Sequence, residues 1–264
     1  MAAVITLLTD FGYQDGYVGV MKGVIASLCP TAKVIDLTHA ISPQNIAAAR
    51  FTLLNAYAYF PPGTIHTVVV DPGVGTERRA IAVQTPDGYL VGPDNGVLSG
   101  VVDEAGPIAV VALTNPQYWR TTDPSTTFHG RDVFAPVAAH LAAGIPLSAL
   151  GTAIAPESLV KIALPTPTIT ETSAIGHVQH IDHFGNIITT LPATVAHQQS
   201  WQMQVGEIDI PLCRTYGEVP IGQALALVGS HGWVEIAVNG SSAQQRFRLA
   251  VGDTVRLFVK QHLK

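Results

Sequence analysis

The chain has 264 residues, of which 47% are hydrophobic and 12% are charged, and its formal net charge is −5. This composition is typical of a globular protein with one large domain or two ordinary ones, and it excludes a disordered chain. The basic residues form no cluster, so the sequence predicts no nucleic-acid partner.

Strand-like and helix-like segments alternate through the first part of the chain. Short apolar runs rich in β-branched residues predict strands at residues 4–9, 33–37, 65–70, 80–85 and 89–91. Helical spacing predicts helices at residues 16–28, 45–59 and 131–143. This alternation predicts an N-terminal α/β domain with a largely parallel sheet over residues 1–163.

The first apolar run stops at Asp10, which makes it too short for a signal peptide or a membrane span. It predicts a buried first strand instead. The two cysteines, Cys29 and Cys213, lie far apart in the sequence and form no CxxC pair, which is typical of reduced thiols. We therefore expect a cytoplasmic protein with no membrane partner.

The second part of the chain has a different texture. A Pro- and Thr-rich stretch at residues 164–168 predicts a linker. Beyond it, strand-like runs separated by turn residues lie at residues 175–181, 186–191, 203–205, 225–228, 234–238 and 254–259. These runs predict a second domain, residues 170–264, that is a small antiparallel β-barrel or sandwich.

Two acidic residues follow predicted strands of the first domain. Asp10 comes directly after residues 4–9, and Asp71 comes directly after residues 65–70. Ligands of α/β sheets bind beyond the carboxyl ends of the strands. Both carboxylates are therefore candidate site residues.

Asp71 opens a segment of unusual composition, DPGVGTERR at residues 71–79. A Pro-Gly turn follows the acid, and Arg78 and Arg79 follow seven and eight residues after it. Gly73 and Gly75 let a ligand approach the backbone closely. The alternative interpretation, an aspartate that caps a turn beside two solvated arginines, is equally compatible with this spacing.

Two further segments carry candidate side chains. His129 stands beside Gly130, just before a predicted helix, where it can face a ligand. The alternatives are a histidine whose hydrogen bonds are satisfied within the fold, or a contact that caps the helix N-terminus. Asp182, Phe184 and Asn186 lie between two predicted strands of the second domain. They offer an acid, a ring and an amide to a ligand, but Asp, Gly and Asn also form hairpin turns.

Metal and phosphoryl-transfer chemistry find little support in the sequence. His177 and His180 point to opposite faces of a strand, and with His183 they match no familiar zinc spacing. No GxxxxGK[ST] phosphate-binding loop is present. We expect no metal site.

Taken together, these segments resemble the S-adenosylmethionine (SAM) hydroxide adenosyltransferase family, which is related to the SAM-dependent fluorinase and chlorinase. The resemblance runs nearly from end to end. It rests on TDFG at 9–12, DPGVGTERR at 71–79, PDNG at 93–96, FHGRD at 128–132, FGN at 184–186, and GSH at 229–231 with EIAVN at 235–239.

The resemblance implies an α/β domain followed by a β-barrel, in a homotrimer that binds substrate between neighbouring subunits. It implies hydrolysis of SAM to adenosine and methionine by water or hydroxide at C5′, without a cofactor. Halogenase-type adenosyl transfer is one alternative. The halogenases have a tyrosine in place of Asp71 and carry an insertion that this chain lacks, and a carboxylate repels halide. A non-catalytic adenosine or SAM sensor is the other alternative.

The resemblance also implies roles for individual residues. The catalytic residues it implies are Asp71, Arg78 and His129. Asp10 is implied to bind the ribose hydroxyls, and His231 replaces the arginine that binds the methionine carboxylate in the halogenases. The full substrate-binding set it implies is Asp10, Asp71, Asp182, Phe184, Asn186, Ser230, Glu235 and Val238.

Overall fold

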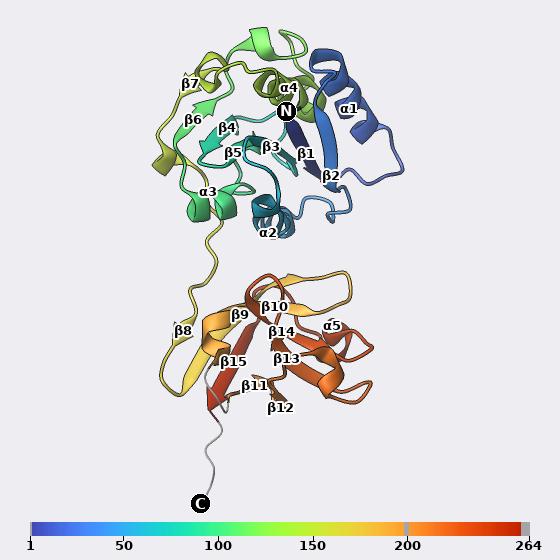
Figure 1. The fold of residues 1–264 in the computed structure, drawn as a ribbon, viewed down its shortest axis with the longest axis vertical. Helices are drawn as coiled ribbons and strands as arrows, with labels where there is room; N and C mark the ends of the chain where they lie inside the picture. The colour runs from blue at the N-terminus through green and yellow to red at the C-terminus, as the bar shows by residue number, and fades with distance from the viewer. Residues whose placement is uncertain (1, 198–200, 260–264) are drawn as a thin grey trace, which may run out of the picture. The chain divides into compact units, whose positions relative to one another are not determined.

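The computed structural model describes residues 2–197 and 201–259. The chain divides into two compact units, Met1–Ile162 and Ala163–Lys264. The first unit combines helices with a sheet, and the second consists mostly of strands (Figure 1).

The first unit contains a seven-stranded sheet in the order β2-β1-β3-β5-β4-β6-β7. Its strands are β1 (Val4–Thr9), β2 (Lys33–Thr38), β3 (Thr64–Val69), β4 (Ala80–Thr85), β5 (Gly88–Pro93), β6 (Ala109–Ala112) and β7 (Thr152–Ala153). Four neighbouring strands, β2, β1, β3 and β5, run parallel to one another. The strands β4, β6 and β7 complete the sheet in antiparallel pairs. The predicted α/β class with a largely parallel sheet is confirmed, with an antiparallel edge of the kind that such sheets often carry.

Helices cover both faces of this sheet. They are α1 (Tyr17–Leu28), α2 (Ile46–Ala56), α3 (Ser99–Ala105) and α4 (Ala135–Ala142). Side chains of α1 and α4 pack into one buried cluster with Ile5 and Leu7 of β1. Side chains of α2 and α3 pack into another with Leu8. Because successive strand residues face opposite sides, β1 contributes to both cores and is buried throughout most of its length.

Two predicted helices differ from the structure at their ends. The helix expected at 45–59 is α-helical only to Ala56 and then tightens into a 3₁₀ turn, Tyr57–Tyr59. The helix expected at 131–143 begins as a π-helical turn, Gly130–Phe134. Pro136 has no N–H to donate to the carbonyl of Asp132. That carbonyl instead accepts a hydrogen bond from the Arg120 N–H at 2.9 Å.

The second unit is an antiparallel sheet that nearly closes into a barrel, as predicted. Its main order is β12-β11-β15-β9-β10-β14-β13, and β8 pairs with β9. A bridge between Leu212 and Ala226 joins the segment after β12 to β13. The strands are β8 (Thr168–Ile169), β9 (Ser173–Ile181), β10 (Ile187–Pro192), β11 (Trp201–Val205), β12 (Ile208–Pro211), β13 (Ala224–Val228), β14 (Trp233–Val238) and β15 (Thr254–Val259), with one short helix, α5 (Ala243–Phe247).

Short 3₁₀ turns complete the described structure, at Pro116–Tyr118, Leu147–Ala149, Pro156–Ser158, Ala193–His197 and Tyr216–Glu218. Across the described residues, no helix has the length and apolar character needed to span a bilayer.

Candidate active site

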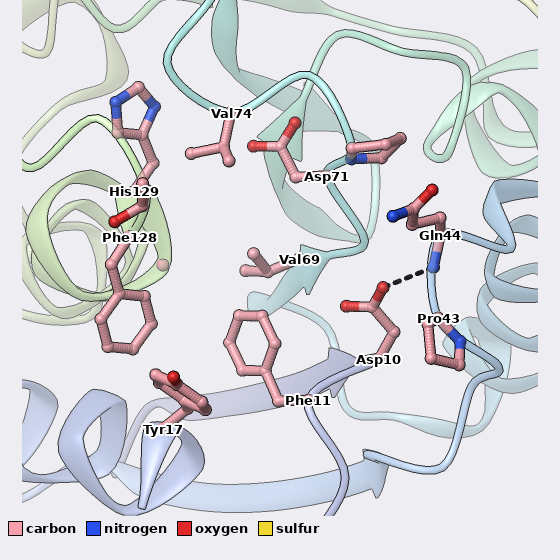
Figure 2. Close-up of a pocket in the computed structure, with 13 residues that line it drawn as sticks. Asp10, Phe11, Tyr17, Pro43, Gln44, Val69, Asp71, Val74, Phe128 and His129 are labelled. Carbon is pink, nitrogen blue, oxygen red and sulfur yellow. Dashed lines mark hydrogen bonds between the residues drawn. The ribbon is translucent and has the colours of Figure 1, made fainter. Parts of the chain in front are cut away.

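A cavity of about 430 Å³ lies at the carboxyl ends of β1 and β3 in the first unit (Figure 2). Both acidic residues that follow these strands, Asp10 and Asp71, line it. Its complete lining is Asp10, Phe11, Tyr17, Pro43, Gln44, Val69, Asp71, Pro72, Val74, Thr127, Phe128, His129 and Gly130. The cavity therefore lies where the topology of a parallel sheet places ligands.

A single guanidinium joins the carboxylate and the imidazole of this cavity. Arg78 Nε donates to Asp71 Oδ1 at 2.8 Å, and its Nη2 bonds Asp71 Oδ2 and lies 2.8 Å from His129 Nδ1. The side chains of Arg78 and Asp71 are 10% and 4% exposed, so this bidentate pair is largely shielded from water. The interpretation of Arg78 as a solvated charge is thus wrong.

The contacts of Arg78 fix the protonation of His129. A guanidinium can only donate, so Nδ1 of the imidazole accepts and its proton is on Nε2. Burial lowers the pKa of His129 below its ordinary value, and the positive charge of Arg78 lowers it further. His129 is therefore neutral at neutral pH and has an Nε2–H group available as a donor.

The backbone around Gly75 explains how Asp71 and His129 come together. Gly75 has a φ of +77°, and a Cβ on it would lie 2.2 Å from the carbonyl oxygen of Thr126. Only glycine allows this close approach between the turn after Asp71 and the segment before His129. Gly75 thus allows two chain segments that are far apart in sequence to lie side by side.

The two neighbouring arginines have different surroundings. Arg79 pairs with the buried carboxylate of Asp94, and its Nη1 donates to the hydroxyl of Ser158 at 3.0 Å. Asp94 also accepts the Val160 N–H at 2.9 Å. Arg79 therefore ties the end of the first unit to its sheet and does not line the cavity.

Asp132 anchors the segment that carries His129. Its carboxylate is fully buried and accepts hydrogen bonds from Arg120, Arg131 and the N–H of Ser125. Burial raises the pKa of Asp132, but these hydrogen bonds and charges lower it far below its usual range. The carboxylate therefore holds both ends of the loop before His129 in place.

Asp10 lies at the opposite side of the cavity from His129 (Figure 2). Its Oδ2 accepts the backbone N–H of Gln44 at 2.7 Å. Oδ1 accepts no hydrogen bond from the part of the chain that the structure describes, and it remains available to a ligand in the cavity.

Three aromatic rings form an apolar wall of the cavity. The ring centroids of Phe11, Tyr17 and Phe128 lie 5.2–5.8 Å from one another in tilted or edge-on arrangements. Two of these rings stand in motifs quoted above, but the sequence did not identify Tyr17 or Gln44 as lining residues. Tyr17 is the first residue of α1 and Gln44 lies in the loop before α2, and nothing in the local pattern of either residue indicates a ligand-facing side chain.

The second unit has a cavity of its own, of about 470 Å³. It is lined by Phe184, Asn186, Tyr216, Val238, Asn239, Gly240, Ser241 and Ser242. Three of the residues implied to bind substrate therefore share this cavity: Phe184, Asn186 and Val238. Phe184 is 76% exposed, which leaves most of its ring accessible.

The turn that carries Phe184 is held from both sides. Asp182 accepts the Asn186 N–H at 2.8 Å and its side-chain amide at 3.0 Å. Gly185 has a φ of +81°, and a Cβ on it would meet the Ser242 hydroxyl at 2.1 Å. The side-chain N–H of Asn186 is thus directed to Asp182, and its carbonyl oxygen is available to a ligand.

Glu235 is 3% exposed and faces other side chains of the second unit. It accepts the Tyr216 hydroxyl at 2.5 Å, and its other oxygen lies 3.0 Å from His231 Nε2. His231 Nδ1 accepts the Trp233 N–H at 3.1 Å. Glu235 therefore reaches the cavity through Tyr216, a lining residue that the sequence did not identify, and both ring nitrogens of His231 have partners within the unit.

Ser230 is exposed in the turn between β13 and β14, outside the lining of this cavity. Among the residues that the structure describes, no group of three or more His, Cys, Asp and Glu side chains is arranged to hold a metal ion.

Known proteins resemble this chain in both sequence and structure. The SAM hydroxide adenosyltransferase N-terminal domain matches residues 5–151, and the C-terminal domain of the same family matches residues 176–256. The (R)-S-adenosyl-L-methionine hydrolase of Salinispora tropica is 41% identical, with 96% of this chain and 97% of that protein covered. The protein of the same name from Thermus thermophilus is 42% identical, with 95% and 97% covered.

More distant and structural relatives agree with this match. The fluorinase of an Actinoplanes species is 27% identical, with 96% of each chain covered. A solved structure of an uncharacterized conserved protein from Thermotoga maritima superposes with a TM-score of 0.89 at 38% identity, covering 96% of this chain and 99% of that one.

Fold and site thus define a protein of an α/β unit and a β-barrel unit, with a carboxylate, a guanidinium and an imidazole joined at the carboxyl end of the sheet. The chain belongs to the SAM hydroxide adenosyltransferase family.

Proposed function

We propose that this protein hydrolyses SAM to adenosine and methionine, with water or hydroxide attacking C5′. The observation that carries the proposal is the Arg78 guanidinium, which bonds both Asp71 and His129 at the edge of the cavity. Family membership and the hydrolase names of relatives at 41–42% identity support it.

The chemistry needs a well-placed oxygen nucleophile more than it needs an acid. The C5′–O bond forms while the C5′–S bond breaks. The electron pair of the C5′–S bond stays on sulfur and neutralises the sulfonium, so methionine leaves without protonation. Asp71 orients the attacking water and accepts its proton, and Arg78 stabilises the negative charge that develops on the water oxygen. His129 donates a hydrogen bond from Nε2 to the same oxygen. Alignment of this oxygen with the C5′–S bond lowers the barrier further, because the bound geometry avoids the entropy cost of bringing the reactants together.

We propose that residues of both units hold the substrate. In the first unit, Oδ1 of Asp10 accepts from a ribose hydroxyl. In the second unit, Phe184 stacks on adenine, the carbonyl oxygen of Asn186 accepts from the adenine amino group, and the Val238 backbone completes this contact. Asp182 serves the site by orienting Asn186.

We propose that the remaining residues of the expected substrate-binding set, Glu235 and Ser230, serve the methionine end of the substrate. Glu235 acts by holding Tyr216 and His231 in place, and Ser230 offers a hydroxyl from its exposed turn. His231 does not replace an arginine as a cationic carboxylate ligand, because both of its nitrogens are engaged within the unit.

The configuration at sulfur is part of the proposal. The relatives are named for the (R) form of S-adenosyl-L-methionine. Since the letter L already describes the amino acid carbon, (R) describes the pyramidal sulfonium. We propose that this chain also takes the (R) epimer.

We further propose a homotrimer in which the first unit of one subunit and the second unit of its neighbour share each site. The separate cavities of the two units, each lined by part of the expected substrate ligands, support this arrangement. We propose that the reaction needs no metal or other cofactor, because the sulfonium is already a good leaving group. Both cysteines are free, which supports a cytoplasmic location.

Chromatography of the protein incubated with each SAM epimer, in halide-free buffer with EDTA, tests the proposal. We expect adenosine and methionine from the (R) epimer.

A second experiment tests the direct attack on C5′. Reaction of substrate with chiral deuterium at C5′ in oxygen-18 water should invert the configuration at C5′ and place the heavy oxygen in the 5′ hydroxyl of adenosine. Bound but unreacted SAM would support a sensor instead, and products that require added halide would support adenosyl transfer to halide.

A further inference from the structure

His39 is a fully buried histidine on the loop between β2 and α2, and the reaction described above does not use it. Its Nδ1 lies 2.8 Å from Oγ1 of Thr9, the last residue of β1. Its Nε2 lies 3.0 Å from Oδ1 of Asp36. The nearby carboxylate favours a proton on Nε2, which leaves Nδ1 to accept from the Thr9 hydroxyl.

The partners of His39 lie on both sides of Asp10. The Thr9 hydroxyl also accepts the N–H of Phe11 at 3.2 Å. The carbonyl of His39 accepts the N–H of Gly12 at 2.8 Å. His39 therefore holds the residue before Asp10 through its side chain and the second residue after it through its backbone.

The same loop also contacts the Asp10 carboxylate directly. Gln44 donates its N–H to Oδ2 (Figure 2). Gln44 has a φ of +65°, in the left-handed region that residues other than glycine rarely adopt. A strained residue that persists in this position is typical of a segment fixed by its surroundings for function.

We propose that His39 is a positioning residue for substrate affinity. Through Thr9 it fixes the start of the loop after β1, so that Oδ1 of Asp10 points into the cavity while Gln44 holds Oδ2. The proposal rests on the proposed role of Asp10 as the ligand of the ribose hydroxyls. It predicts that the His39–Thr9 contact affects binding of the adenosine end and not the chemical step.

The chain provides a matched control for this contact. Thr6 lies in β1 as Thr9 does, and its hydroxyl lies 2.9 Å from Nδ1 of the buried His66 in β3. This pair has the same chemistry, but neither residue lines the cavity or neighbours Asp10. Loss of the Thr6–His66 contact should lower stability and leave substrate affinity unchanged.

The experiment measures the Kd for adenosine by calorimetry, together with kcat and KM for SAM, in the whole protein. His39→Leu and Thr9→Val should each raise Kd and KM about tenfold and change kcat less than about twofold, as expected for the loss of one aligned hydrogen bond. The double variant should be no worse than either single variant, because both changes break the same contact. His39→Asn places an acceptor near the position of Nδ1 and should restore the Kd to within about threefold of the unaltered protein.

Three results would overturn the proposal. One is an unchanged Kd in Thr9→Val, which preserves the packing even if His39→Leu does not fold. Another is a rise in Kd of similar size in the control variants Thr6→Val and His66→Leu. The third is an unaltered protein that binds no adenosine. A protein that binds adenosine but releases no methionine would instead contradict only the proposed hydrolysis, since the Kd comparison does not depend on turnover.

Discussion

At the scale of single residues, the site depends on how one arginine divides its hydrogen bonds. Arg78 donates to Asp71 and to His129, while the adjacent Arg79 donates to Asp94 and Ser158 outside the cavity. The Arg78–Asp71 and Arg79–Asp94 pairs each have a buried carboxylate. The pair of Arg79 therefore serves as a control for the pair of Arg78.

Asp71→Asn should lower kcat by about 100-fold or more, because the amide neither accepts a proton from water nor pairs with the Arg78 charge. Adenosine should still bind, since Asp10 and the second unit are unaffected. Steady-state kinetics and calorimetry on the same preparation measure both effects. The control Asp94→Asn should lower the melting temperature and retain kcat. Equal losses of kcat in the two variants would assign Asp71 a structural role.

The acidic limb of the pH profile should report His129. Its neutral form accepts from Arg78, and its pKa is lowered from 6.5 by burial and by that positive charge. Protonation at low pH removes the acceptor and places two positive charges side by side, so kcat/KM should fall as the pH drops through a midpoint below 6.5. His129→Asn keeps an acceptor but does not titrate, and its profile should lack this limb. A midpoint above 6.5 would contradict the assignment.

At the scale of elements, the strand β3 carries a titratable group in its buried interior. His66 is 5% exposed, and burial lowers its pKa from 6.5 to about 4. The folded protein therefore binds this proton less readily than the unfolded chain does. The contribution of neutral His66 to the free energy of unfolding is fully present above pH 6.5 and is lost as the pH falls toward about 4.

This lowering corresponds to about 3 kcal/mol of unfolding free energy. Denaturant titrations across the same pH range should show a decline in stability that is smaller by about this amount in His66→Leu. The comparison cancels the contributions of other histidines. An identical decline in both proteins would show that His66 titrates normally in the fold.

At the scale of the whole molecule, the proposed sharing of sites between subunits has a consequence that separate sites lack. Light scattering should give three times the chain mass of 27.8 kDa. Asp71→Asn impairs the first unit, and Asn186→Leu impairs the second. After random reassembly of an equimolar mixture of the two inactive variants, the trimers should together regain about a quarter of the unaltered activity, because under this proposal each site takes one unit from each of two neighbours. No recovery in a verified mixed trimer would place each whole site within one chain.

The sequence by itself determined the features that follow from local pattern. The apolar runs that end at Asp10 and Asp71 predicted two parallel strands with acids at their carboxyl ends, because burial on both faces requires continuous apolar residues. The turn-separated strands of the second part predicted the antiparallel barrel. The short motifs identified the family, and they contained the catalytic residues that we propose.

The tertiary structure decided which of those residues meet. The spacing after Asp71 does not distinguish Arg78 from Arg79, whereas in the fold Arg78 bonds His129 and Arg79 bonds Asp94. The close approach of Gly75 to Thr126 brings the turn after Asp71 beside the segment before His129. The bonds from Gln44 to Asp10 and from Tyr216 to Glu235 likewise join segments 34 and 19 residues apart. Contacts of this kind depend on backbone geometry and on burial by distant elements, which periodicity and turn signals within a single segment do not encode.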